Sequence, residues 1–278
     1  MMRLALVGGC LPAAAGAQPR YAAAPPTAAL ELEIQQRLRL TAAGPAAPAQ
    51  QRHRSLKLRL APAAAGAGHW RWTVRRVAAA HQLGEQEIDP GGAEQLQGKA
   101  LVAAIGPAGP KDAALRIEPA AGLDATWAAA LPWAELLRLG LRLGLPPLPA
   151  EPLRPGDCWS AEQRLPATLP GAEGLEIVLW SVFTATGFED CAAGRCARIE
   201  QIGRVSLVER RLLGDSMVTV DFFGGLRASH LLGPAGPLAS KGRLELDCQL
   251  LSHRAPGLPP RFATRAAIEL DYRSRPAG

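Results

Sequence analysis

The chain has few of the residues with which enzymes and metal proteins do their chemistry. Its 278 residues include five Cys and five His, and no two His lie four residues apart or in a His-Glu-x-x-His motif. A zinc peptidase is therefore not expected. The Gly-x-Ser-x-Gly motif and the phosphate-binding loop motif are also absent, which argues against a serine hydrolase and a nucleotide hydrolase. We predict no catalytic residues, no metal and no cofactor, and hence a protein that is not an enzyme.

Long apolar runs and long basic runs are missing as well. The most Leu-rich segment, residues 131–148, contains Glu135, Arg138, Arg142 and three Pro, so it is not the uninterrupted stretch of about 20 apolar residues that a transmembrane helix needs. The net charge is +6, but basic residues do not run beyond pairs such as Arg210-Arg211. We therefore expect no transmembrane segment after the N-terminal signal and no nucleic-acid partner.

The first 17 residues have the pattern of a secretion signal. Arg3 supplies the positive charge, residues 4–11 are mostly apolar, and Ala15-Gly16-Ala17 forms a small-residue cleavage site. This predicts a periplasmic or secreted protein. Residues 7–10, Val-Gly-Gly-Cys, also match a lipid-attachment motif, so an outer-membrane lipoprotein anchored through Cys10 is the alternative.

Four cysteines remain beyond the signal, as expected for a disulfide-bonded protein of an oxidising compartment. Cys191 and Cys196 flank four residues that read as a hairpin loop, and cysteines facing each other there can reach disulfide geometry. We predict one bridge between them and a second between Cys158 and Cys248. A zinc site is the weaker alternative, because no His lies close to the C-x4-C pair.

Alternation of apolar and polar residues dominates the chain. It is clear in residues 30–40, 56–60, 70–75, 244–250 and 268–272, and it is typical of antiparallel strands with one buried and one solvated face. Residues 177–183 are apolar at almost every position, which predicts a strand covered on both faces. Gly224-Gly225 predicts a bulge or bend between strands.

One amphipathic helix is predicted over residues 134–143. Its charged residues form one narrow stripe, and a wide apolar arc covers the other side. A Pro-rich connector, residues 145–156, follows and divides the chain into an N-terminal half (residues 18–144) and a C-terminal half (residues 157–278). Both halves contain Gly-Pro-Ala-Gly-Pro before an alternating strand, so two similar halves produced by duplication are one alternative.

The string Gly156-Asp157-Cys158-Trp159-Ser160 resembles the segment around the nucleophile of papain-like cysteine peptidases. There the cysteine begins a long helix whose N-terminus stabilises the thiolate. Here Pro166 and Pro170 leave no room for such a helix. A turn leading into a strand with a bridged cysteine is the preferred interpretation, and a cysteine hydrolase using Cys158 is an unlikely alternative.

Two aromatic residues, Trp70 and Trp72, share one face of a strand. Core packing explains them best, because Arg71 and Arg75 occupy the opposite face. If the curved sheet encloses an open apolar cavity instead, Trp70, Trp72, Leu136 and Leu141 are the residues expected to line it and to bind a ligand.

Residues 148–159, with Leu-Pro before a Pro-Gly-Asp-x-Trp element, resemble a class of uncharacterised exported β-rich proteins of Gram-negative bacteria. That resemblance implies no activity or site residues. More distantly, strands that curl around an amphipathic helix are similar to the periplasmic lipoprotein carriers of the LolA/LolB kind, a likeness of architecture alone.

Together these patterns predict a mainly β protein, with an antiparallel curved sheet or half-barrel around one amphipathic helix. The expected function is that of an exported cell-envelope protein that binds a partner without catalysis. That partner is unknown; an envelope protein or a lipid fits. A periplasmic lipid or lipoprotein carrier with an apolar cavity is the alternative.

Overall fold

A computed structural model describes residues 28–42, 49–63, 69–106, 109–110, 116–118, 125–148, 152–166, 176–191, 194–213, 216–233, 236–253 and 262–277. The signal-like segment and Cys10 lie outside the described residues. Cys158 and both residues of the Cys191–Cys196 pair lie within them.

The described chain is mainly β-strand, as predicted. The N-terminal strands are β1 (Leu30–Ala42), β2 (Gln50–Pro62), β3 (His69–Leu83), β4 (Gln86–Ile88), β5 (Ala100–Gly106), β6 (Gly109–Pro110) and β7 (Arg116–Glu118). The C-terminal strands are β8 (Cys158–Pro166), β9 (Glu176–Cys191), β10 (Gly194–Leu213), β11 (Ser216–Gly233), β12 (Gly236–His253) and β13 (Phe262–Pro276). A short 3-10 helix, η1 (Ala93–Leu96), lies between β4 and β5.

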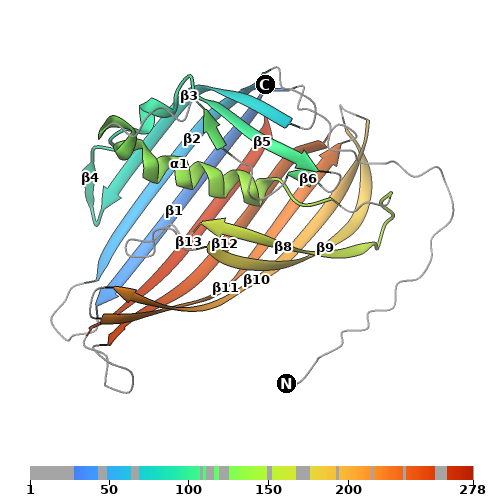
Figure 1. Ribbon diagram of the computed structural model, residues 1–278. Coiled ribbons are helices and arrows are strands. Elements are labelled where there is room, and N and C mark those ends of the chain that lie inside the picture. Colours follow the sequence, from blue (N-terminus) through green and yellow to red (C-terminus); the bar gives the residue numbers. More distant parts are fainter. Residues whose placement is uncertain are drawn as a thin grey trace, which may run out of the picture.

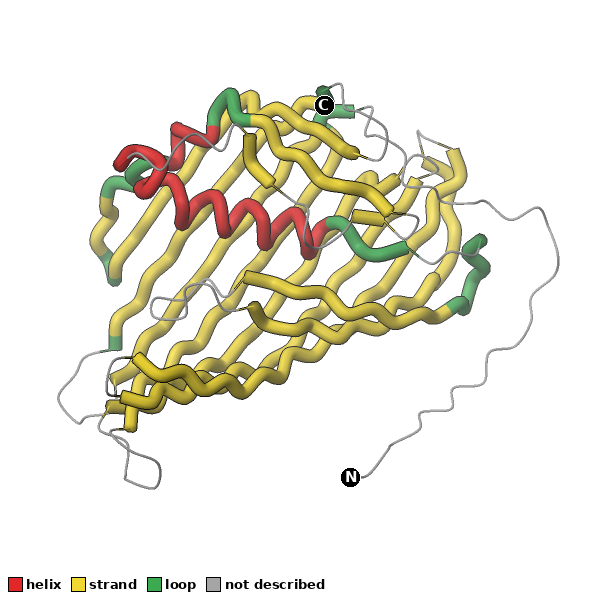
Figure 2. The backbone as a smooth tube through the Cα atoms, viewed as in Figure 1, coloured by secondary structure: helices red, strands yellow, loops and turns green. Residues whose placement is uncertain are grey.

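Eleven strands follow one antiparallel path, in the order β6-β5-β3-β2-β1-β13-β12-β11-β10-β9-β8, and the sheet is open. Its centre is the pairing of the first and last strands, which runs without a register shift from Leu30–Pro276 to Ala42–Thr264. Strands of both halves therefore belong to one sheet. Figures 1 and 2 show the sheet curling at both ends around a helix.

That helix is α1 (Ala125–Gly144), the one α-helix among the described residues, and it crosses the concave face of the sheet (Figure 1). It begins nine residues before the predicted start. The amphipathic pattern reveals its second half only, because residues 128–130 are all Ala and contribute helix propensity without marking a face. Pro132 lies inside it.

The alternation in the sequence places large apolar side chains between the sheet and α1. One cluster joins inward-facing residues of the strands, such as Ile34, Leu60 and Leu270, with Leu137 and Leu141 of the helix. Burial of this apolar surface is the main force holding the helix in the sheet, at about 25 cal/mol for each Å² removed from water.

Gly140 marks the closest approach of the helix to the sheet. A Cβ at this position would lie 2.3 Å from Cδ1 of Ile34 on β1. Because glycine in a helix costs about 1 kcal/mol relative to alanine, its presence here is explained by packing: without a side chain at Gly140, the helix axis can lie directly over β1.

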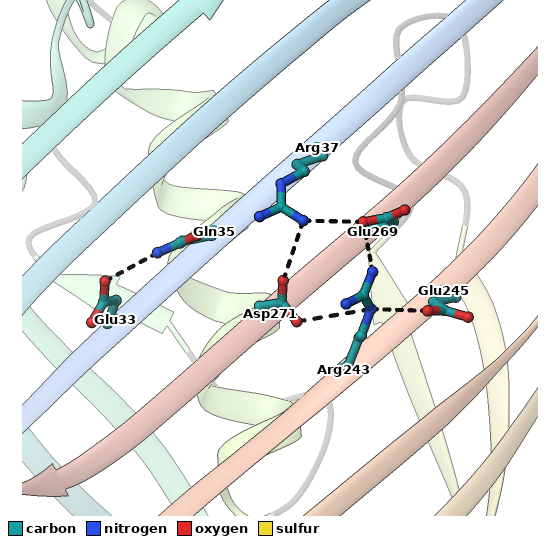
Figure 3. A network of polar contacts seen from close by, with 7 residues as sticks. All are labelled: Glu33, Gln35, Arg37, Arg243, Glu245, Glu269 and Asp271. Atoms are coloured by element: carbon teal, nitrogen blue, oxygen red, sulfur yellow. Dashed lines mark hydrogen bonds and ion pairs between the residues drawn. The ribbon is translucent and has the colours of Figure 1, made fainter.

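The outer face of the sheet is charged over its central strands. Figure 3 shows a network in which Arg37 of β1 and Arg243 of β12 both pair with Glu269 and Asp271 of β13. Arg243 also contacts Glu245, and Gln35 donates to Glu33 (Figure 3). The residues are a third to two thirds exposed, so each pair contributes little alone, but the network keeps this face polar.

Two local predictions are wrong. Residues 177–183 form part of β9 but are not covered on both faces, since Trp180 and Val182 are 59% and 52% exposed. Gly224 and Gly225 lie inside β11, where pairing with β12 continues in register. A Cβ at Gly224 would lie 2.1 Å from the carbonyl oxygen of Glu245, so this glycine permits a close approach of the β12 backbone and forms no bulge.

Candidate functional site

The four residues predicted to line a cavity are all buried in one large apolar cluster. Trp70 and Trp72 of β3 are 3% and 2% exposed, and Leu136 and Leu141 of the helix are 1% and 2% exposed. All four belong to the same apolar cluster. In this conformation all four side chains are covered by protein atoms, so these residues form part of a filled core.

The two tryptophans carry polar groups that this packing does not satisfy. Their rings meet edge to face, with centroids 5.7 Å apart. The indole Nε1 atoms of both are buried and have no hydrogen-bond partner among the residues that the structure describes. A buried N–H group without an acceptor costs about 1–3 kcal/mol, and two such donors side by side form a place where carbonyl oxygens would be bound.

The C-terminal end of α1 is fixed by donors from the sheet. The last carbonyl groups of a helix have no partner within the helix. Here Gln163 of β8 donates to Arg142 O at 3.1 Å, Tyr272 of β13 donates to Leu143 O at 2.9 Å, and Ser240 of β12 donates to Gly144 O at 2.7 Å. Burial raises the pKa of the Tyr272 hydroxyl, which stays a donor throughout the ordinary pH range.

A buried chain of hydrogen bonds joins these caps across five strands, from β8 to β12. Gln201 of β10 donates through Nε2 to Gln163 at 3.3 Å and to Ser181 at 2.9 Å. Its Oε1 therefore faces Nε2 of His230 at 2.8 Å, and Nδ1 of His230 lies 2.9 Å from Ser240 Oγ. Each of these residues is 2% exposed.

His230 is neutral in this network. Burial lowers its pKa to about 3, so the ring carries one proton, either on Nε2 facing Oε1 of Gln201 or on Nδ1 facing Oγ of Ser240. Ser240 and His230 lie side by side as in a hydrolase, but both are buried and the serine hydroxyl is engaged by the helix carbonyl. The chain of hydrogen bonds is a positioning device for α1. Sequence reasoning missed it, although Gln163, Gln201 and His230 stand at inward-facing positions of alternating strands, which is a detectable signal.

The middle of α1 is held by Trp133. Its Nε1 donates to the carbonyl oxygens of Pro90 and Gly91, the latter at 3.1 Å. His81 meets the same ring edge to face, and the Arg54 guanidinium lies 6.0 Å from the ring centroid. Burial, aided by the Arg52 charge, lowers the pKa of Arg54.

The Gly-Asp-Cys-Trp string forms a turn that leads into β8, as predicted, but its cysteine is not bridged. Gly156 has φ of 90°, and Oδ2 of Asp157 accepts from the backbone N–H of Arg154 at 2.6 Å. Trp159 stacks on Phe183 with centroids 5.3 Å apart and donates to Pro147 O. The element therefore anchors the connector to the sheet.

The predicted bridge between Cys158 and Cys248 is wrong. Cys191 and Cys196 are bonded, but Cys158 is an exposed thiol and Cys248 a buried one. β8 and β12 are separated by three strands, about 19 Å at 4.8 Å per strand, whereas a disulfide needs Cα atoms within about 7 Å. The two thiols also face opposite sides of the sheet. Burial and the Asp221 charge raise the pKa of Cys248 to about 12.

Cys158 and His230 do not form a nucleophile–base pair. The Cys158 sulfur lies on the outer face, 3.6 Å from Oγ1 of Thr184 and 3.5 Å from Gly156 O, whereas His230 lies in the interior. No group of three or more metal-ligating side chains occurs among the described residues.

Among the pockets formed by described residues, three have no lining from the four predicted cavity residues. One of them, of about 450 Å³, is lined by His230 and Ser240 of the buried chain together with exposed residues such as Lys241. Another, of about 340 Å³, lies over β1, β2, β3 and β13 and has Arg59, Arg76 and Arg273 in its lining. Over the described ranges, no helix is long and apolar enough to cross a membrane. No family model and no curated protein matches the chain.

Proposed function

We propose that the protein is a non-enzymatic binding protein of the bacterial cell envelope. Its ligand has an apolar chain and a carbonyl-bearing head, and it is bound on the inner face of the sheet beneath α1. The observation that carries this proposal is the pair of buried, unpartnered indole N–H groups of Trp70 and Trp72 within an apolar cluster. An ester or amide carbonyl would supply the missing acceptors.

The way in which α1 is held supports ligand entry by displacement of the helix. No strand pairing depends on α1, because the sheet ladder runs behind it from β6 to β8. The helix is attached by apolar contacts and by hydrogen bonds at Trp133 and at residues 142–144. It can leave the concave face while every ladder hydrogen bond remains.

Transport of lipids or lipoproteins is a second candidate, favoured by the same open curved sheet around a helix. The Cys191–Cys196 disulfide supports an oxidising compartment for either function, since disulfides persist in the periplasm and outside the cell. Release by cleavage after Ala17 and anchoring through a lipid on Cys10 are both consistent with these functions, and intact-mass measurement of the native protein distinguishes them.

A disulfide that locks the helix tests the proposal. A Cβ at Gly144 would lie 4.0 Å from the Cβ of Ser240, within the range of about 3.5–4.5 Å found in disulfides. We would introduce Gly144→Cys and Ser240→Cys together in a Cys158→Ser background. Binding of a dansyl-labelled fatty acid ester is then measured by fluorescence before and after reduction.

The oxidised, locked protein is expected to bind the ester at least tenfold more weakly than its reduced form. The single variant Gly144→Cys, treated with the same oxidant, is the control and should not change. Equal binding by the locked and reduced forms, or no binding by the wild-type protein, contradicts the proposal.

The two indole groups are tested separately with Trp70→Phe and Trp72→Phe. Each variant keeps an aromatic ring but removes one donor, so affinity for the ester should fall about fivefold, as expected for a lost hydrogen bond of about 1 kcal/mol. Affinity for a hydrocarbon probe without a carbonyl group should change less. Loss of both affinities to the same degree would show that the rings only fill space.

A further inference from the structure

Two of the pockets adjoin each other, since Arg273 and Arg275 of β13 line both. One, of about 340 Å³, extends from β13 across β1 and β2 to β3. The other, of about 450 Å³, extends from β13 across β12, β11 and β10 to β9. Together the two pockets cross eight neighbouring strands, a span of about 34 Å at 4.8 Å per strand.

The charged side chains of these pockets point away from α1. Tyr272 and Ser240 both donate hydrogen bonds to carbonyl groups at the end of the helix, so they face inward. Successive side chains of a strand point to opposite faces of the sheet. Arg273 and Lys241, which follow Tyr272 and Ser240 in the chain, therefore stand on the outer face, and both are exposed.

Positive charge is in surplus along the two pockets. Among the described residues that line them, seven are cations and four are carboxylates, which leaves a surplus of three positive charges. We call these eleven residues the basic band: Lys57, Arg59, Arg76, Arg198, Lys241, Arg273, Arg275, Glu31, Glu33, Glu189 and Glu200. The neighbouring network has the opposite balance, because Arg37 and Arg243 meet the three carboxylates of Glu245, Glu269 and Asp271 (Figure 3).

Basic side chains of the band face each other across neighbouring strands. Lys241 of β12 lies directly opposite Arg273 of β13, and Arg59 of β2 lies directly opposite Arg76 of β3. Like charges at directly opposite positions destabilise a sheet. An anion bound from outside the chain would relieve this repulsion.

The carboxylates of the band do not neutralise the pair of Lys241 and Arg273. Three of them form ion pairs with other cations of the band: Glu31 with Arg275, Glu33 with Lys57 and Glu189 with Arg198. Glu33 also lies opposite Arg273, but its carboxylate is shared with Lys57, 3.0 Å away. Glu200 lies opposite Ser229, which lies opposite Lys241, so two strand spacings, about 10 Å, separate Glu200 from Lys241. Lys241 has no ion pair or hydrogen bond within the part of the chain that the structure describes.

The chemistry of the two linings favours a hydrophilic ligand. None of the large hydrophobic side chains that are exposed in the described ranges lines either pocket. A surface that inserts into a bilayer presents apolar and aromatic side chains, and a surface that binds single-stranded nucleic acid stacks the bases on aromatic rings. Charges and polar groups such as the Ser229 hydroxyl are what this band offers.

We propose that the basic band binds a linear polysaccharide with acidic groups along its length. Two adjoining pockets in one line suit an extended chain, and the surplus of cations attracts a ligand whose negative charge is repeated. Acidic groups of the chain lie between Arg59 and Arg76 and between Lys241 and Arg273, and sugar hydroxyls bind Ser229. Because these side chains face away from α1, the polysaccharide and a ligand on the inner face of the sheet can be bound at the same time.

Fluorescence anisotropy with labelled polymers tests the proposal. Polygalacturonate carries carboxylates, dextran sulfate carries sulfates, and dextran is the neutral probe. The wild-type protein should bind an acidic polymer and not dextran, more weakly as the salt concentration rises. The acidic polymer that binds more tightly identifies the acidic group. Each of Lys241→Gln and Arg273→Gln should weaken binding about two- to fivefold, the effect of one exposed ion pair, and the double variant about tenfold.

The matched control is Arg39→Gln with Arg210→Gln, which removes two exposed arginines from β1 and β10 outside the lining of both pockets. This control lowers the net charge as much as the double variant does, but it should keep most of the binding. Lys241→Gln should unfold at the wild-type temperature or above it, because it removes a like-charge contact.

Three outcomes would overturn the proposal. One is that neither acidic polymer binds, and another is that the control weakens binding as much as the double variant. The third is that a single-stranded oligonucleotide with the same number of charges binds more tightly than either acidic polymer, because the occupant would then be a nucleic acid.

Discussion

At the residue scale, Gly140 sets how closely α1 approaches the sheet. We expect Gly140→Ala to lower the free energy of unfolding by about 1–2 kcal/mol, because overlap of the new methyl group with Ile34 outweighs the gain in helix propensity. Gly144→Ala is the matched control: its Cβ would meet only ordinary contacts at 3.8 and 4.0 Å. Urea unfolding measures the free energy of unfolding of both variants. Equal values would show that the helix shifts away from Ile34 without a loss of stability.

Also at the residue scale, His230 makes stability depend on pH. Its pKa is about 3 in the folded protein and near 6.5 when unfolded. Between these values the unfolded chain binds more protons than the folded protein. The contribution of neutral His230 to the free energy of unfolding is therefore complete above pH 6.5, and it is lost as the pH falls toward 3, by up to about 1.4 kcal/mol per pH unit.

The variant His230→Gln isolates this contribution. It removes the titrating group, so its stability should decline less steeply between pH 6.5 and 4 than that of the wild type. The slope is compared, and not the absolute stability, because the substitution also disturbs the hydrogen bonds to Gln201 and Ser240. Parallel curves would show that His230 does not remain neutral in the fold.

At the scale of elements, the C-terminal end of α1 depends on its caps. Tyr272→Phe leaves the buried Leu143 carbonyl without its donor, which should cost about 1–3 kcal/mol. Because the loss is local, hydrogen exchange should accelerate at the end of α1 more than in β1 or β2. If hydrogen exchange accelerated equally across the protein, the Tyr272 hydroxyl would stabilise the fold as a whole and not the end of α1.

Individual elements also show what the sequence predicts and what it does not. β1, β12 and β13 are visible from alternation because one face of each is wet. The exposed face of β9 cannot be recognised from alternation, because the apolar residues Trp180 and Val182 on that face make β9 resemble a strand buried on both faces. The order of the strands in the sheet cannot be predicted from local patterns either. Cys158 and Cys248 both lie in segments predicted as strands, but the distance between those strands depends on the strand order of the whole sheet.

The candidate ligand site stays a prediction. Trp70, Trp72, Leu136 and Leu141 are buried in one apolar cluster, which fits the core packing that alternation and helical periodicity indicate. Side-chain volumes and contacts such as that of Gly140 with Ile34 decide whether a helix fills the concave face. Such contacts depend on tertiary packing, which local sequence patterns do not reveal. The polar chain around His230 links five strands, β8 to β12, and reaches α1 through Gln163 and Ser240, so local patterns reveal its members but not their partners.

At the scale of the whole molecule, the central pairing of β1 with β13 joins the two ends of the described chain. Leu30 lies opposite Pro276, so a short linker can connect them in a circular permutant with new ends in the connector between α1 and β8. The permutant turns the most distant strand pair into a hairpin. Closing a loop of that length in the wild type costs up to about 3 kcal/mol more than closing a hairpin of a few residues.

We therefore expect the permutant to keep the β-sheet circular dichroism of the wild type and to fold faster, since folding rates rise as contacts become more local. Stopped-flow refolding measures the folding rate. The same permutant, after a protease has cut the linker between β13 and β1, serves as control. If the continuous ladder from β6 to β8 is the structural unit, the strands of both halves must form together in one cooperative transition. Two separate unfolding transitions would show that the halves fold independently and that the β1–β13 pairing is only a contact between them.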